Sequence, residues 1–339
     1  MKSAIRSALQ TVVSISGAGS LIRAGLRRHL LVLCYHGVVS GDPKDRFGYG
    51  NTVSVEEFRS HLRLLGRHFH PVTMADVIAD RSSGRGLPEG AALITFDDGY
   101  RNNLTHAAPV LREAGISCVF HVSTGYIGTK NVLWTDEVIG RIVGWQGKTL
   151  PLPGGGEQET PRDLAARRSL GMRLKEQCKR MDRDVVSGWI DRLRKGSAEP
   201  AANPELYDFM TWDEVRALHS QGFDIGSHTV SHPILTRIPA DRLEWELSES
   251  KRTIEREVNA PCEAIAYPNG GAADVSEAVF AATRVAGYKL GFTVAERHSP
   301  PGEDAMQISR LCIQGHLPLR AFSFRVDGVQ RVLRPGTPQ

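Results

Sequence analysis

Short apolar runs rich in β-branched residues alternate with longer segments of helical periodicity along most of this chain of 339 residues. Such alternation predicts parallel strands joined by crossover helices, an α/β fold. Seven runs predict strands: His29–His36, Ala91–Phe96, Ser117–Ser123, Gly222–His228, Glu263–Pro268, Lys289–Val294 and Ile308–His316. Seven strands in this arrangement indicate a closed or nearly closed barrel.

The segments between these strands carry helix signals and one long interruption. A helix is predicted to begin at Ser54, which forms a capping box with Glu57. Between residues 128 and 204 the pattern changes to a Pro- and Gly-rich loop followed by charged helical sequence. We expect residues 128–204 to be a helical insertion on the rim of a barrel domain spanning 29–330, with 331–339 as a flexible tail.

The N-terminal segment, residues 1–28, is basic and amphipathic. No acidic residue precedes Asp42, and one helical face carries Ile5, Leu9, Val12 and Val13. Its apolar stretch is too interrupted for a convincing signal peptide, and no segment is long enough to span a bilayer. We therefore expect a cytoplasmic protein whose N-terminal helix docks on the barrel or contacts an anionic membrane surface.

Composition narrows the function classes. The chain has 41% hydrophobic and 24% charged residues, and its net charge of +4 is scattered, which argues against a nucleic-acid partner. Its five cysteines are odd in number and far apart, which favours reduced thiols over a disulfide framework.

Polar residues follow several of the predicted strands. Asp97 and Asp98 come after one strand, and His228 and His232 follow another. The C-terminal ends of parallel barrel strands gather at one face, so these side chains are expected to converge. Two close carboxylates repel unless a cation lies beside them, and one Asp with two His suits a catalytic divalent metal site. The alternatives are a helix-capping turn at the Asp pair and a chance spacing of the His pair.

Further candidates have both functional and structural interpretations. His36 and His316 follow the first and last strands, and a Gly-rich turn occupies Pro268–Gly271. Each histidine is either catalytic or a core residue at the barrel mouth. Trp134 and Trp212 either line a sugar groove or pack on the rim.

Three motifs in this order resemble those of a known family. "TFDDG" (Thr95–Gly99), "SHTVSH" (Ser227–His232) and "AYPNG" (Ala266–Gly270) are similar to the first three motifs of the polysaccharide deacetylase family, the NodB-homology or carbohydrate esterase family 4 proteins. The resemblance in strand order extends from about Leu31 to Ile313. It implies a distorted (β/α)7 barrel and removal of N-acetyl groups from an amino-sugar poly- or oligosaccharide.

The resemblance also implies roles for individual residues. Asp97 corresponds to the general base. Asp98, His228 and His232 correspond to ligands of a divalent metal, usually Zn²⁺, with Co²⁺, Ni²⁺ or Mn²⁺ as alternatives. The backbone amide of Asn269 corresponds to the group that holds the oxyanion.

The sequence also departs from the family pattern. Many members carry an Arg two residues before the Pro of the third motif, where this chain has Ala266. We hypothesise that Arg310 supplies the missing cation beside Asp97. The usual Asp-Trp motif is absent. The segment "YHGV" resembles a branch in which a first-strand His reaches the site, so His36 is the first candidate for the general acid and His316 the second.

Two rival functions remain at this stage. The same site could deacylate a lipid-linked sugar or another non-sugar amide, which the basic N-terminal segment favours. The chain could instead be a non-catalytic saccharide-binding member of the family. The intact Asp97 argues against that second alternative.

Overall fold

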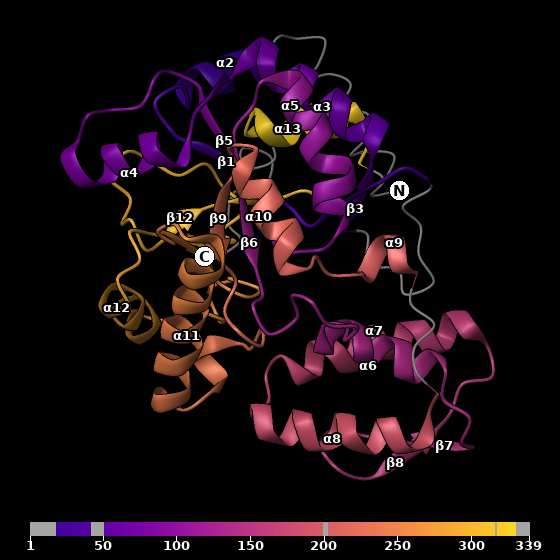
Figure 1. The fold of residues 1–339 in the computed structure, drawn as a ribbon. Coiled ribbons are helices and arrows are strands. Elements are labelled where there is room, and N and C mark those ends of the chain that lie inside the picture. The colour runs from indigo at the N-terminus through magenta and orange to yellow at the C-terminus, as the bar shows by residue number, and fades with distance from the viewer. Residues whose placement is uncertain (1–17, 42–50, 199–202, 316, 330–339) are drawn as a thin grey trace.

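The computed structural model describes residues 18–41, 51–198, 203–315 and 317–329, and Figure 1 shows their arrangement. The amphipathic face predicted for residues 1–17, the tail from 330 onward and the candidate acid His316 lie outside the described residues.

The core of the fold is one parallel sheet that nearly closes on itself. Its strands follow the order β12-β11-β10-β9-β6-β5-β1-β13, with β4 (His70–Pro71) pairing alongside β5. The path comprises β1 (Leu31–Tyr35), β5 (Ala91–Phe96), β6 (Cys118–Val122), β9 (Asp224–Ser227), β10 (Ala264–Ala266), β11 (Leu290–Thr293), β12 (Ile308–Ser309) and β13 (Leu311–Cys312).

The two ends of this path belong to one stretch of chain. Only Arg310 separates β12, which pairs with β11, from β13, which pairs with β1. The broken last strand therefore joins both edges of the sheet, giving seven strand positions around a nearly closed barrel. All seven predicted strands are present, and the barrel prediction is confirmed. The single last strand expected over Ile308–His316 is wrong in one respect, because it is interrupted at Arg310.

Alternation along the strands separates the inside of the barrel from its outside. Val32, Leu93 and Val119 belong to one buried cluster, in which the only described helix residues are Met74 and Val77 of α4 (Met74–Ser83). Their neighbours Leu31 and Ile94 belong to a larger cluster that also holds the buried apolar residues of the helices outside the barrel. Successive strand side chains point to opposite faces. The first cluster therefore fills the interior and the second packs beneath the surrounding helices.

Helices cover the outside of the barrel, and several begin at side-chain caps. The predicted capping box of Ser54 and Glu57 is present at the start of α3, and Thr211 caps α10 in the same way. The covering helices include α3 (Val55–His68), α5 (Ala108–Ala114), α10 (Trp212–Ser220), α11 (Ala240–Val258), α12 (Glu277–Val285) and α13 (Leu319–Val326). In the described part of the chain, none of the helices has the length and apolarity needed to cross a bilayer.

A separate group of helices lies to one side of the barrel (Figure 1, lower right). It contains α6 (Trp134–Val143), the hairpin β7 (Thr149–Pro151) and β8 (Glu157–Glu159), α7 (Leu164–Cys178) and α8 (Arg183–Gly196). These elements share their own buried cluster, which includes Trp134, Leu170 and Trp189. They make up the described core of the insertion that we propose for residues 128–204. The short helix α9 (Pro204–Tyr207) follows it.

Candidate active site

The two adjacent aspartates reach one cavity because the backbone turns between them. Asp97 continues the inward-facing positions of β5, so Asp98 would face outward if the strand continued. Instead Asp98 has φ 76° and Gly99 has φ 92°, both left-handed. Both carboxylates consequently line the same cavity. The bend begins at Asp98 itself, before the glycine, in a backbone conformation that is strained for a residue with a side chain and is of the kind found at functional sites.

Asp98, His228 and His232 converge on one point. Asp98 Oδ1 lies 3.5 Å from His228 Nε2 and 3.5 Å from His232 Nε2. His228 Nδ1 lies 2.7 Å from the Ala266 carbonyl oxygen, to which it donates when protonated, so Nε2 keeps its lone pair facing Asp98. Asp98 Oδ1 is buried and has no hydrogen-bond donor among the described residues. A carboxylate oxygen without a donor and two imidazole nitrogens close to it form a ligand set that fits a divalent cation.

The loop that carries the two histidines is held from behind by Glu246 of α11. The fully buried Glu246 carboxylate accepts hydrogen bonds from the backbone N–H groups of Val230 and Ser231, at 2.8 and 2.9 Å, and from the Ser231 hydroxyl at 2.6 Å. His232 itself has φ 52°, and its N–H donates to the Thr229 hydroxyl at 3.1 Å. Sequence reasoning missed Glu246, because nothing in a surface helix pattern distinguishes one inward Glu from its exposed neighbours.

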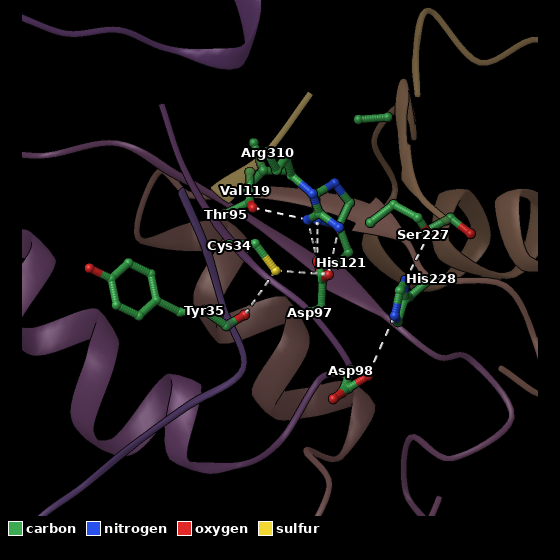
Figure 2. A network of polar contacts seen from close by, with 12 residues as sticks. Cys34, Tyr35, Thr95, Asp97, Asp98, Val119, His121, Ser227, His228 and Arg310 are labelled. Atoms are coloured by element: carbon green, nitrogen blue, oxygen red, sulfur yellow. Dashed lines mark hydrogen bonds and ion pairs between the residues drawn. The ribbon is translucent and has the colours of Figure 1, made fainter. Parts of the chain in front are cut away.

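Asp97 has a different set of partners, shown in Figure 2. The guanidinium of Arg310 donates to both Asp97 oxygens at 2.8 Å and to the Thr95 hydroxyl at 3.1 Å. The Arg310 side chain is completely buried. The structure thus places Arg310 where the sequence hypothesis required a cation, in a bidentate geometry that suits a carboxylate.

Two further contacts to Asp97 were missed from the sequence. His121 Nδ1 lies 3.2 Å from Asp97 Oδ1, and the Cys34 thiol donates to Asp97 Oδ2 at 3.2 Å. Gly226 makes room for the imidazole, since a Cβ on it would lie 2.4 Å from His121 Cδ2. The inward positions of β1 and β6 were readable as barrel interior, but their contact with Asp97 depends on the packing across the barrel.

The surroundings drive the pKa values of the two carboxyls in opposite directions. Burial alone would raise the pKa of Asp97, but the Arg310 charge, with His228 and His121, holds it well below the usual value. Burial, followed by the charges of Asp97 and Asp136, raises the pKa of Asp98 well above the usual value. A cation at Asp98 would remove this penalty.

The other predicted site residues line the same cavity, which has a volume of about 360 Å³. A ring nitrogen of the half-buried His36 lies within 4.8 Å of ligand atoms of both Cys34 and Asp97. Burial lowers the pKa of His36. Asn269 has φ 58°, and its buried side-chain Nδ2 has no acceptor among the described residues.

The insertion forms one wall of this cavity rather than only its rim. From α6, Asp136 accepts a hydrogen bond from the Tyr100 hydroxyl at 3.0 Å. From α7, Lys175 lies 3.1 Å from the Glu176 carboxylate, which Lys179 also approaches at 3.0 Å. All five side chains line the cavity.

Fold and site together define a parallel α/β barrel with a candidate acid–base carboxylate beside a candidate metal-binding trio. The family described as Polysaccharide deacetylase matches residues 84–143 and 185–291. The chain belongs to this family, the NodB-homology or carbohydrate esterase family 4 proteins.

Two curated relatives match a shorter region. The poly-beta-1,6-N-acetyl-D-glucosamine N-deacetylase of Escherichia coli (strain K12) is 29% identical over 121 residues, covering 34% of this chain and 18% of that protein. YxkH of Bacillus subtilis (strain 168) is 28% identical over 110 residues, covering 32% of this chain and 37% of YxkH. The matched region therefore spans well under two thirds of either relative.

Solved structures share the fold over most of the chain. The Streptococcus pyogenes deacetylase PplD in complex with acetate superposes with a TM-score of 0.57 at 16% identity, covering 87% of this chain and 96% of that one. IcaB from Ammonifex degensii has a TM-score of 0.56 at 18% identity, covering 88% and 97%.

Proposed function

We propose that this protein is a metal-dependent hydrolase that removes N-acetyl groups from an amino-sugar-containing saccharide. The observation that carries the proposal is the pair of adjacent aspartates with opposite surroundings. Asp97 is kept ionised by Arg310, whereas Asp98 faces two imidazoles and its Oδ1 has no donor within the described part of the chain. Membership in the polysaccharide deacetylase family supports the reaction class.

Each site residue has a task in this hydrolysis. A divalent cation held by Asp98, His228 and His232 would polarise the acetamide carbonyl and acidify a water molecule. Asp97 accepts the proton of the attacking water, and the backbone amide of Asn269 supports the developing oxyanion.

The leaving amine needs a proton, and we assign its delivery to His36. Its ring lies close to Asp97, so the proton that Asp97 collects has a short route to it. Burial lowers the pKa of His36, so the free imidazole is neutral near pH 7 and donates only after such a transfer. The variant His36→Ala tests this assignment, because turnover should fall while the metal content stays at the wild-type level.

The name of the Escherichia coli relative suggests the substrate class. We propose oligomers of N-acetyl-D-glucosamine, with β-1,6-linked chains as the first to test. A deacylase of lipid-linked sugars is the rival outcome. Membrane contact through the N-terminal segment and a cytoplasmic location stay proposals that rest on the sequence alone.

The deciding experiment combines metal analysis with acetate release. Purified protein should take up about one equivalent of Zn²⁺ or Co²⁺ and release acetate from N-acetylglucosamine oligomers, and Asp97→Asn should retain the metal without the activity. Stoichiometric metal with no acetate release from any oligomer, but with turnover of an acylated lipid-linked sugar, would favour the rival. No metal uptake by the folded protein would reject the hydrolase.

A further inference from the structure

Two of the five cysteines of the chain lie side by side where the barrel closes. Cys34 belongs to β1 and Cys312 to β13, and the two residues are partners in the parallel register that joins these strands. The Ile313 N–H donates to the Cys34 carbonyl at 2.8 Å, which holds this register. Strands in a sheet are spaced by about 4.8 Å, and a disulfide spans Cα atoms that are about 4.4–6.8 Å apart. The pair is therefore close enough to be linked without rearrangement of the backbone.

Both cysteine side chains lie on the catalytic side of their strands. The Cys34 thiol donates to Asp97 Oδ2 at 3.2 Å, as Figure 2 shows. Cys312 lines the catalytic cavity together with Asp97. Burial, followed by the contact with the Cys312 thiol, raises the pKa of the Cys34 thiol. The register pair is thus also a pair of interacting side chains beside the proposed base.

The other three cysteines lie on separate elements. Cys118 is in β6, Cys178 is the last residue of α7, and Cys262 lies in the loop before β10. All three are buried, whereas the Cys312 side chain is partly exposed at the wall of the catalytic cavity. A small oxidant that enters this cavity therefore reaches Cys312, and the buried Cys34 is its immediate neighbour.

We propose that Cys34 and Cys312 form a reversible disulfide that inhibits the proposed active site. The proposal rests on the proposed function, because it concerns the control of the same base. Hydrogen peroxide oxidises the Cys312 thiol to a sulfenic acid, and the first water molecule leaves. The Cys34 sulfur then attacks the Cys312 sulfur, and the sulfenic hydroxyl group leaves with the Cys34 proton as the second water molecule. Two thiols are oxidised to one disulfide while one peroxide is reduced to two molecules of water.

The disulfide changes the surroundings of Asp97. A disulfide sulfur carries no hydrogen, so Asp97 Oδ2 loses the donor that Cys34 provides. Asp97 keeps Arg310 but loses a contact that helps to hold the orientation of the proposed base. We expect kcat/KM to fall about tenfold, the order of magnitude for the loss of one hydrogen bond to a charged group. Neither cysteine is a candidate metal ligand, so the zinc content should not change.

Peroxide treatment of the zinc-loaded full-length protein tests the disulfide directly. Titration of the denatured protein should show a fall from five free thiols to three, since one disulfide consumes two. Mass spectrometry of an unreduced digest should find the peptides that contain Cys34 and Cys312 joined. Acetate release should fall about tenfold while zinc stays bound, and a phosphine reductant should restore it.

Two variants show whether this pair is responsible. Cys312→Ser lacks one of the two thiols, so peroxide should leave its acetate release at the value measured before treatment. Cys178→Ala keeps both cysteines of the pair and should lose activity as the wild type does.

The possible outcomes separate this inference from the proposed function. An oxidised wild type without the cross-link, a cross-link that leaves acetate release unchanged, or equal inactivation of Cys312→Ser overturns the inference. A cross-link that forms in a protein unable to release acetate in its reduced state overturns the proposed function and leaves the disulfide site standing.

Discussion

Asp97 and Asp98 are neighbours in sequence and face the same cavity, yet their surroundings differ in almost every respect. Both Asp97 oxygens accept hydrogen bonds, from Arg310 and from the Cys34 thiol, and His121 Nδ1 lies 3.2 Å from Oδ1. Asp98 has none for its Oδ1 among the described residues and faces only imidazole nitrogens. The difference teaches that like charges can be adjacent when one is neutralised by the protein and the other is left for an ion.

The largest expected effect on turnover comes from replacing Asp98, the aspartate whose Oδ1 has no donor among the described residues. Asp98→Asn should lower turnover about 10³-fold and remove stoichiometric metal, because positive charge at the carbonyl contributes several kcal/mol to transition-state stabilisation. Asn tolerates the left-handed backbone at this position, so the fold should persist. Acetate release and metal analysis measure both effects. Asp241→Asn, at an exposed position on α11, is the control, and retention of full metal by Asp98→Asn would contradict the ligand assignment.

The second largest effect on turnover should come from replacing Asp97, and it should differ from the effect of replacing Asp98 in leaving the metal bound. Asp97→Asn should lower turnover by roughly 10²- to 10⁴-fold, the range of a general base, while metal content stays at the wild-type level. Parallel assays of zinc content and kcat decide this. If metal were lost together with activity, the two carboxylates would share the ion and the contrast drawn above would fail.

Without the Arg310 charge, Asp97 should become like Asp98, a buried carboxyl with a raised pKa. Arg310→Met should lower turnover roughly 10- to 100-fold at neutral pH without metal loss. Without Arg310, burial raises the pKa of Asp97, so the acid limb of the pH–rate profile should move to higher pH. A profile that superposes on the wild type would reject the role.

The same variant should also lose stability, because a buried carboxylate would remain without its partner, at a cost of about 3–5 kcal/mol. The lowered pKa of Asp97 stabilises the wild type above the usual carboxyl range, and this contribution disappears as pH falls through the folded-state value. The difference in unfolding free energy between wild type and Arg310→Met should therefore shrink at acidic pH. Urea unfolding at several pH values measures it.

The smallest expected effect concerns the support of the histidine loop. Glu246→Gln should weaken metal affinity by about tenfold, because the carboxylate that orders Val230 and Ser231 loses part of its acceptor strength. The acid limb governed by Asp97 should not move. Competition with a zinc chelator measures the affinity, and Glu244→Gln on the exposed face of the same helix is the control. An unchanged affinity would show that Glu246 stabilises only the fold.

Period-2 patterns and strand-end chemistry predicted the parts of this protein that depend on local sequence. The seven strands, the Ser54 cap and the convergence of Asp97, Asp98, His228 and His232 follow from apolar runs and the rule that parallel strands end on one face. The position of Arg310 was inferred from an absent family residue, and its contact with Asp97 is confirmed by the geometry.

Contacts across the barrel could not be predicted from local sequence patterns. His121, Cys34 and Glu246 meet their partners only because strands and helices distant in sequence pack together, and no local pattern records that packing. The wall that α6 and α7 contribute to the catalytic cavity was missed for the same reason. An insertion is recognised by a change of pattern, which gives its limits but not the surface on which it folds.

The break in the last strand has a consequence for how the protein is assembled. Arg310 is the residue between the two short segments that join the opposite edges of the sheet, and its side chain is also the counter-charge of Asp97. The barrel therefore cannot close in register without delivering the guanidinium to the carboxylate. In a chain whose barrel has not closed, Asp97 lacks this counter-charge, so closure of the barrel and formation of the Asp97–Arg310 ion pair are one event.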